Sequence, residues 1–304
     1  MLKISIENLK QKQALPLDIK VLLTQNRIRD WHYHWFGKTY ISFSGGKDST
    51  VLLHLVRNLF PETPAVFCDT GLEYPEIKEF VKTKDDITII RPKMNYKKVI
   101  EKYGYPVISK EQARYIRLYR TTKSQKMKNK CWMGSKNGYF KISEKWKFLV
   151  DAPFKISEEC CDVMKKRPFK IYEKETGRKG YLGIMAGDSH LRKLNYMKTG
   201  CNAFENNRPL SQPMSFWLEK DIWEYIKQNN LSYAPIYDKG ITRTGCIFCM
   251  FSLFKNKFDK FAKLQELHPK LYRHCMEDLG IRKVLDYINS HIDKNYYQEA
   301  LDFE

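Results

Sequence analysis

The stretch Thr39-Tyr40-Ile41-Ser42-Phe43-Ser44-Gly45-Gly46-Lys47-Asp48-Ser49-Thr50 decides the fold that we expect for this chain. β-branched and aromatic residues at 39–43 predict a strand, the glycine pair predicts a tight turn, and the apolar pattern of 51–60 predicts a helix. Such a junction turns backbone N–H groups and the positive end of a helix toward an anion, and Lys47 adds a point charge. Hydroxyl donors come from Ser44, Ser49 and Thr50. We therefore expect a phosphate-binding loop at residues 44–49.

The spacing of this loop differs from two better-known phosphate loops. A Walker A loop has four residues between its glycines before Gly-Lys-Ser/Thr, and a dinucleotide turn needs Gly-x-Gly-x-x-Gly. A glycine pair alone is common in ordinary turns. The prediction rests on six consecutive residues at a strand–helix junction.

Strands and helices continue to alternate along the chain. The predicted strands are 65–69, 87–91 and 181–186, and the predicted helices are 75–82, 96–103, 109–118 and 218–227. This alternation is typical of a parallel sheet with right-handed crossovers. We therefore expect an α/β fold, a Rossmann-like parallel sheet flanked by helices.

Both ends of the chain have helical patterning. The N-terminal pattern is interrupted at Pro16, and a second pattern runs from about residue 255 onward. We expect a helical N-terminal extension at 1–37, a nucleotide-binding domain with a metal site at 38–254, and a helical C-terminal extension at 255–304.

The composition favours anionic partners. Lys and Arg number 54 against 35 Asp and Glu, a formal net charge of +19, which suits nucleotides and nucleic acids. The alternative is a solvated lysine-rich surface, because lysine is spread through the whole chain. Only the run at 123–130, KSQKMKNK, is densely basic, and it is either a nucleic-acid contact or a loop. Without a long apolar run or a signal-peptide pattern, we expect a cytoplasmic protein with no membrane partner.

Four of the eight cysteines have a spacing that indicates metal chemistry. Cys160 and Cys161 are adjacent, and Cys246 and Cys249 form a CxxC about 85 residues later. Four thiolates can hold a [4Fe–4S] cluster, whereas tetrahedral zinc is the alternative. The adjacent pair alone could also be two buried small side chains. The remaining cysteines lack paired spacing, and we expect Cys275 to be a packed thiol.

The loop at 44–49 resembles the pyrophosphate-binding loop of the adenine nucleotide α-hydrolase superfamily. The stretch CDTGLEYPE at 68–76 resembles the Asp-Thr-Gly-x-x-x-Pro-Glu signature of the phosphoadenosine phosphosulfate (PAPS) reductase family. The resemblance implies that Asp69, Thr70 and Gly71 lie at the nucleotide, with Asp69 near the phosphates or their Mg²⁺.

A second resemblance includes the cysteines. The order Cys-Cys, then Trp217 with DIWEYI at 221–226, then Tyr237-Asp238-x-Gly240 before the CxxC is similar to the iron–sulfur adenylyl-sulfate (APS) reductases. The similarity runs from about residue 38 to 250. It implies a [4Fe–4S] cluster on Cys160, Cys161, Cys246 and Cys249.

Two departures separate the chain from those reductases. Their nucleophilic cysteine lies in a Glu-Cys-Gly-x-His tail, whereas no cysteine follows Cys275 here. The stretch 183–192 resembles the family's Gly-x-Arg-x-x-x-Ser-x-x-Arg segment. Ser189 and Arg192 match that segment, but Met185 replaces its first arginine, and a methionine cannot bind phosphate or sulfate in a bidentate manner.

We therefore expect an ATP pyrophosphatase that adenylates a substrate for sulfur insertion, of the nucleic-acid thiolation or DNA phosphorothioation type, with a cysteine desulfurase or other sulfur donor as partner. Catalysis is expected from Lys47, Asp48, Arg192 and Mg²⁺. The nucleotide would contact residues of the loop and of the two matching segments: Ser44, Gly45, Gly46, Lys47, Asp48, Ser49, Thr50, Asp69, Thr70, Gly71 and Ser189. One alternative is an APS or PAPS reductase that releases sulfite and uses Cys275 or a partner's thiol. The other is a regulatory protein that binds nucleotide without turnover.

Overall fold

The computed structural model describes residues 3–135, 140–251, 253 and 260–292. The chain divides into two compact units that interleave along the sequence. The first unit comprises Met1–Asp69, Glu73–Arg91 and Pro168–Thr244, and the second comprises Thr70–Leu72, Pro92–Arg167 and Gly245–Glu304.

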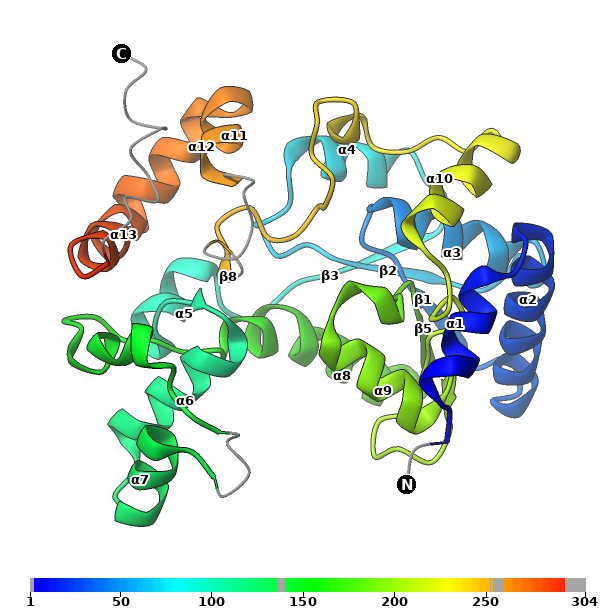
Figure 1. Cartoon of the computed structure of the whole chain (residues 1–304). Helices are drawn as coiled ribbons and strands as arrows, with labels where there is room; N and C mark the ends of the chain where they lie inside the picture. The colour runs from blue at the N-terminus through cyan, green and yellow to red at the C-terminus, as the bar shows by residue number, and fades with distance from the viewer. Residues whose placement is uncertain (1–2, 136–139, 252, 254–259, 293–304) are drawn as a thin grey trace. The chain divides into compact units, whose positions relative to one another are not determined.

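The first unit is built on a six-stranded sheet of order β3-β2-β1-β5-β7-β6 (Figure 1). Its strands are β1 (Thr39–Ser42), β2 (Ala65–Cys68), β3 (Ile87–Ile90), β5 (Lys179–Leu182), β6 (Asn202–Ala203) and β7 (Leu210–Ser211). All neighbours pair in parallel except β6 and β7, which are antiparallel. β1 and β2 are almost entirely buried, as expected of central parallel strands. The expected α/β fold is confirmed.

Helices flank this sheet. They are α1 (Ile6–Ala14), α2 (Leu17–His34), α3 (Lys47–Arg57), α4 (Pro75–Lys82), α8 (Arg167–Thr176), α9 (His190–Thr199) and α10 (Glu219–Gln228). The break at Pro16 is confirmed, because α1 ends at Ala14 and α2 begins at Leu17. The helix after the loop begins at Lys47, four residues earlier than the apolar pattern predicted. Lys47 and Asp48 therefore lie in its first turn.

A buried ion pair fixes α10 against α2 in the first unit. Lys20 Nζ lies 2.7 Å from Asp221 Oδ2, with side-chain exposures of 1% and 4%. The same Asp221 oxygen accepts the backbone N–H of Leu218 at 2.7 Å and so caps α10. Trp217 Nε1 also donates to Thr24 Oγ1 of α2 at 2.8 Å. These contacts hold the start of α10, where Glu219 lies.

The second unit is mainly helical. It contains α5 (Tyr96–Tyr103), β4 (Val107–Ile108), α6 (Lys110–Thr121), α7 (Gln125–Met133), η1 (Glu144–Asp151), η2 (Asp162–Lys166), β8 (Met250–Phe251), α11 (Lys260–Leu267), α12 (Pro269–Arg273), η5 (His274–Asp278) and α13 (Ile281–Asn289). β4 and β8 pair in parallel. The Ser109 hydroxyl caps α6 by accepting the N–H of Gln112 at 3.1 Å. The helical prediction for the C-terminal part holds for α11 to α13, and 293–304 lie outside the described residues.

The division into segments 1–37, 38–254 and 255–304 stays a prediction, because the two units are defined by contacts and not by family boundaries. Among the described residues, no helix has the length and apolar character needed to cross a membrane.

Candidate functional site

The phosphate loop follows β1 and requires its glycines. Gly45 has a φ of +72°, a left-handed conformation that side chains disfavour. A Cβ there would lie 2.8 Å from the side chains of Ile77 and Val81 in α4. A Cβ on Gly46 would lie 2.8 Å from Thr244 Oγ1. The loop therefore packs closely on α4 on one side and on the segment 237–244 on the other.

Hydroxyl groups brace the loop from inside. The side chains of Ser49 and Thr50 both donate to the Gly46 carbonyl, at 2.8 Å and 3.1 Å. Ser49 Oγ also accepts the backbone N–H of Ser44 at 3.1 Å. Both residues are buried. Within this structure these two hydroxyls stabilise the shape of the loop, and their predicted contact with nucleotide stays a prediction.

Lys47 concentrates the donor groups of the loop. Its backbone N–H donates to the Tyr237 hydroxyl at 2.9 Å, and its Nζ donates to the Thr242 carbonyl at 3.1 Å. Nζ also lies 3.2 Å from Glu219 Oε1 and 5.3 Å from the centre of the Tyr237 ring. The side chain is 5% exposed. Every group that Lys47 contacts is an oxygen or a ring face.

Charged side chains from four segments, at 47–48, 188, 219 and 243, meet beside the loop. Burial raises the pKa of Asp48, and the nearby carboxylates of Asp188 and Glu219 raise it further, whereas Lys47 and Arg243 oppose the shift. Asp48 Oδ1 is buried and has no hydrogen-bond partner. The cluster therefore places a buried carboxyl group between cations, Lys47 and Arg243, and other carboxylates.

Asp188 links the arginines of this cluster. It forms an ion pair with Arg192 and accepts Arg243 Nη2 at 3.1 Å. Ser189 caps α9 by accepting the N–H of Arg192 at 3.3 Å. Arg192 is therefore neutralised by Asp188 here, and its predicted catalytic role requires that a phosphate compete for its guanidinium group.

The second nucleotide segment is divided between the units. Asp69 directly follows β2 in the first unit, where it pairs with Lys78 at 3.0 Å and with Arg91 at 3.3 Å. Thr70 and Gly71 belong to the second unit, where Thr70 Oγ1 accepts the Leu72 N–H at 3.2 Å. Their predicted contacts with nucleotide stay predictions.

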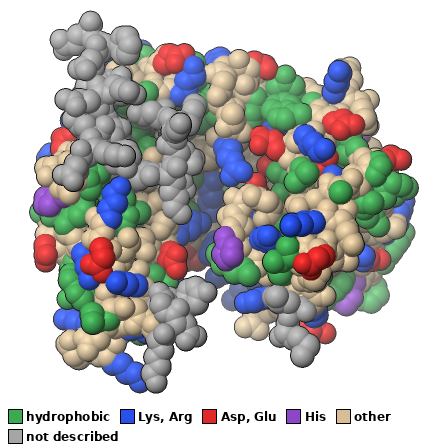
Figure 2. Space-filling view, in the orientation of Figure 1, with side chains coloured by type: hydrophobic (Ala, Val, Ile, Leu, Met, Phe, Trp, Pro, Cys, Tyr) green, Lys and Arg blue, Asp and Glu red, His purple; other side chains and the backbone are tan. Residues whose placement is uncertain are grey.

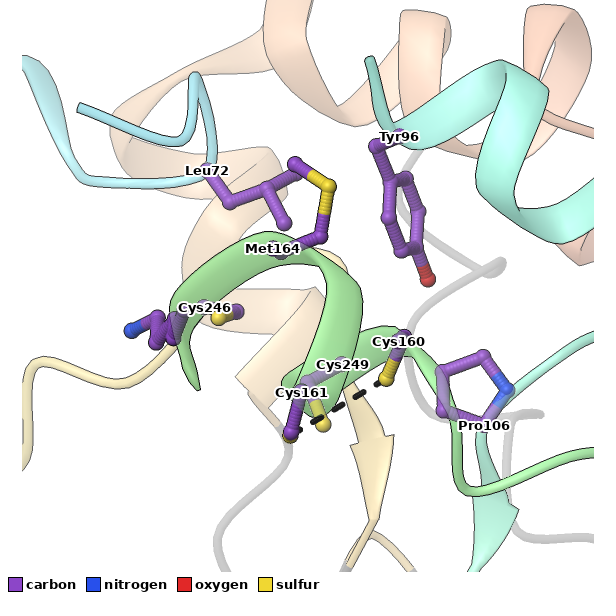
Figure 3. Close-up of a pocket in the computed structure, with 9 residues that line it drawn as sticks. Leu72, Tyr96, Pro106, Cys160, Cys161, Met164, Cys246 and Cys249 are labelled. Atoms are coloured by element: carbon purple, nitrogen blue, oxygen red, sulfur yellow. Dashed lines mark hydrogen bonds between the residues drawn. The ribbon is translucent and has the colours of Figure 1, made fainter. Parts of the chain in front are cut away.

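The four cysteines predicted to bind metal line one cavity of the second unit, of ≈ 300 Å³ of empty volume including space open to solvent. Figure 3 shows them around this cavity. The other lining residues are Leu72, Tyr96, Pro106, Met164 and Lys165. The adjacent pair has its Sγ atoms 4.0 Å apart, and the π-helix η2 follows it directly, a distortion frequent at functional sites. Segments about 85 residues apart in sequence therefore present their thiols to one space.

Cations surround these thiols. The Cys160 thiol donates to Cys161, and this hydrogen bond, with Lys110 and Lys165, lowers the pKa of Cys161. Burial raises the pKa of Cys249 to about 11, and the charge of Lys260 opposes that shift. An environment of this kind favours the thiolate form at Cys161, the form that binds metals.

Lys260 also braces the CxxC turn. Its Nζ donates to the carbonyl oxygens of Cys246 and Cys249, and the Cys249 N–H donates to Cys246 O at 3.1 Å. Four cysteines in one cavity, with lysines nearby, suit a soft, negatively charged metal–thiolate group. Within the described part of the chain, no three His, Cys, Asp or Glu side chains converge as ligands of a single metal ion. A metal at this cavity therefore belongs to the proposal below.

Four residues at the loop were not singled out as site residues from sequence: Glu219, Tyr237, Thr242 and Thr244. Tyr237 was noted only as part of a family-like pattern. The sequence contains little else that could have identified these four residues, because a single glutamate, threonine or tyrosine far along the chain has no spacing that relates it to Lys47.

The parallel sheet and the glycine turn between β1 and α3 define an α/β protein with a glycine loop at the carboxyl edge of its sheet. The chain belongs to the phosphoadenosine phosphosulfate reductase domain family, which it matches over residues 38–137 and 128–252. The resemblance identified from the sequence is thereby confirmed.

Individual relatives are distant. An uncharacterized protein of Methanocaldococcus jannaschii is 27% identical over 244 residues, which are 78% of this chain but 46% of that protein. The adenosine 5'-phosphosulfate reductase of Lysinibacillus sphaericus is 22% identical, covering 72% of this chain and 76% of the relative. The phosphoadenosine 5'-phosphosulfate reductase of Xylella fastidiosa is 24% identical, covering 77% and 82%. Among solved structures, the PAPS reductase of Candida auris has a TM-score of 0.43 at 16% identity, covering 81% of this chain and 97% of that chain.

Proposed function

We propose that this protein is an ATP pyrophosphatase that adenylates an acceptor so that sulfur can be inserted. The observation that supports the proposal most strongly is the convergence of donors at Lys47, where a backbone N–H and an ammonium group meet at the first turn of α3. Helix N-termini bind phosphate through the N–H groups of their first turn, and here a phosphate would take the place of the Tyr237 hydroxyl at the Lys47 N–H.

The proposed reaction cleaves the bond between the α- and β-phosphates of ATP. An acceptor oxygen attacks the α-phosphorus, the anhydride bond breaks, and pyrophosphate leaves with the bonding electron pair. A sulfide-level sulfur nucleophile from the donor then forms a bond to the activated atom, and AMP leaves with the electron pair of the bond that breaks. Lys47, the loop amides and Arg192 would stabilise the charge on the phosphates, which is the main catalytic device available for phosphoryl chemistry.

Bound Mg²⁺ would neutralise part of the triphosphate charge. The family resemblance gives Asp69 as its carboxylate. In this structure Asp69 is paired with Lys78 and Arg91. These cations would have to release Asp69 or turn to the phosphates when the metal binds.

The cysteine cavity would hold a [4Fe–4S] cluster, with Cys160, Cys161, Cys246 and Cys249 as ligands. When bound, such a cluster can carry or deliver sulfur. Lys260 would hold the CxxC turn by its bonds to the two carbonyls. Lys110 and Lys165 would offset the negative charge of the thiolates.

A sulfonucleotide reductase is the second candidate, because reductases of APS and PAPS are among the relatives. That reaction needs an accessible thiolate. Cys275, the stand-in considered from sequence, is 0% exposed, and burial raises its pKa to about 12. Both properties make it a poor nucleophile, so this route would need a thiol from another protein.

The test compares products. Protein purified without oxygen is incubated with ATP, APS or PAPS in the presence of Mg²⁺ and of tRNA or DNA as acceptor, and pyrophosphate and sulfite are measured. We expect pyrophosphate from ATP and no sulfite. Sulfite at enzymatic rates would overturn the proposal in favour of the reductase, and nucleotide binding without any product would favour a regulatory protein.

The cluster has its own test. Replacement of Cys161 by Ser should remove the brown colour and most of the iron and acid-labile sulfide, because it deletes the thiol whose pKa is lowered. Cys201→Ala is the matched control, since Cys201 is a buried thiol of the first unit and should leave the iron content unchanged. Zinc without iron or sulfide in the wild-type protein would contradict the assignment.

A further inference from the structure

Helix α7 and the end of α6 carry an unusual share of the protein's positive charge. Residues 110–133 contain eight Lys or Arg and one Glu, so this stretch supplies seven of the nineteen net charges of the chain. Residues 125–130 of the densely basic run at 123–130 lie within helix α7. Lys126, Lys128 and Lys130 therefore have defined positions on a helix, and Lys123 precedes its cap.

One face of α7 is exposed and basic. Lys126, Asn129, Lys130 and Met133 follow the spacing i, i+3, i+4 and i+7, which places them on the same side of the helix. All four are exposed, and Met133 is 73% exposed. Lys123, just before the cap, is exposed too. Figure 2 shows Lys and Arg side chains on the surface where α7 lies. We call these five residues the α7 face.

The opposite side of α7 packs against the second unit. Cys131 is completely buried. The ring of Trp132 lies 5.3 Å from that of Tyr119 in α6, and Lys147 Nζ lies 4.2 Å from the centre of the Trp132 ring. The helix is therefore anchored, and its basic face is held toward solvent.

Within the described residues, the lysines of the α7 face have no carboxylate partner, and Lys130 Nζ lies 4.5 Å from the centre of the Phe140 ring. None of Lys123, Lys126, Lys128 and Lys130 forms an ion pair there. The first turn of α7 has no acidic residue, and Lys126 lies in this turn. A positive charge at the positive end of the helix dipole destabilises the helix. By contrast, Arg117 of α6 is paired with Glu158 at 2.6 Å. A polyanion would supply the missing counter-charge.

We propose that the α7 face binds the sugar–phosphate backbone of a nucleic acid. Its lysines would neutralise phosphates, and exposed Met133 with half-buried Trp132 would offer an apolar contact beside them, a combination typical of nucleic-acid surfaces. This surface indicates that the acceptor of the proposed adenylation is a nucleic acid, and this role as acceptor site rests on the proposed function. Binding of nucleic acid to the α7 face does not depend on the proposed function.

The test replaces charged lysines by glutamine, which is uncharged and has a similar helix propensity. The variant Lys123→Gln/Lys126→Gln/Lys130→Gln is compared with Lys10→Gln/Lys170→Gln/Lys174→Gln, in which three exposed lysines of the first unit are changed. The charge lost is the same, so any general effect of net charge cancels. Circular dichroism checks that both variants fold.

Binding of fluorescently labelled DNA, single-stranded or duplex and about 20 nucleotides long, is measured by fluorescence anisotropy over a range of salt concentrations. For wild type and the control variant we expect a steep fall of affinity with salt. For the α7 variant we expect a loss of at least ten-fold at about 100 mM salt and a salt slope smaller by about 2 to 3 units, since each phosphate contact contributes about 0.7 to 0.9.

Three results would overturn the proposal: no binding by the wild-type protein, equal losses in the two variants, or equal competition by polyglutamate, which would indicate an acidic protein as partner. Pyrophosphate release from ATP, measured in the same samples, separates the two proposals. Intact DNA binding without release defeats the proposed function alone, and release without DNA binding defeats the α7 surface alone.

Discussion

Gly45 illustrates how a single backbone angle shapes the phosphate loop. Its φ of +72° and the 2.8 Å approach of a Cβ to Ile77 and Val81 mean that Gly45→Ala adds both backbone strain and overpacking. We expect a loss of about 2 kcal/mol or more in the free energy of unfolding, measured by urea denaturation. Gly187→Ala is the control, because a Cβ there meets nothing within 4 Å. Equal stability of the two variants would contradict this account of the loop.

Asp48 allows a test by pH. Burial raises its pKa above the ordinary value of 3.8, with further increases from Asp188 and Glu219. Above that value the unfolded state ionises more readily than the folded state, so the contribution of Asp48 to stability falls as pH rises from about 4. Asp48→Asn removes the charge.

We therefore expect Asp48→Asn to raise the Tm at pH 7, with a smaller difference at pH 4, while turnover falls. Thermal unfolding followed by circular dichroism at the two pH values checks this. A variant that is less stable at pH 7 than the wild type would show that the Asp48 carboxylate is stabilised in the fold.

At the scale of elements, the anchoring of α10 determines where Glu219 meets Lys47. Lys20→Met leaves Asp221 charged and buried, which costs about 3 to 5 kcal/mol when one partner of such a pair is removed. Lys20→Met/Asp221→Leu removes both charges and should recover a large part of that loss. Urea denaturation of both single variants and the double variant measures the coupling. Additive losses would show that the two residues act independently.

The sequence predicts the elements well where hydrophobic period and capping agree. The ranges 75–82 and 96–103 match α4 and α5 to the residue. The start of α3 is missed because Lys47 to Thr50 have no apolar pattern, and a glycine without a side chain occupies the cap. Propensity rules recognise apolar periodicity, whereas this first turn exists to present polar groups.

Local sequence patterns predict the residues of the candidate site even less completely than they predict the helices and strands. The glycine loop and the cysteines are visible in sequence because their members are adjacent or regularly spaced. Tyr237 and Glu219 reach Lys47 across about 170 to 190 residues of sequence. That proximity follows from the strand order of the sheet and from the ion pair between Lys20 and Asp221, and neither can be read from local patterns.

At the scale of the molecule, the proposed nucleotide-binding loop and the proposed metal site lie in different units. The loop and its contacts belong to the first unit, and the cysteine cavity belongs to the second. Lys47→Ala should therefore abolish nucleotide binding and leave the iron content intact, whereas Cys161→Ser should remove iron and leave equilibrium nucleotide binding intact. Parallel measurement of iron and of ATP affinity in both variants checks this independence. Loss of both properties in either variant would contradict it.

The central claim is that the loop directs attack at the α-phosphorus of ATP. The most direct measurement uses ATP labelled at that phosphorus, with the products separated by chromatography. We predict that label accumulates in AMP, or in an adenylated acceptor, together with an equal amount of pyrophosphate, and that Lys47→Ala lowers the rate by about 10²-fold to 10³-fold. Label recovered in ADP, with release of inorganic phosphate, would contradict the account.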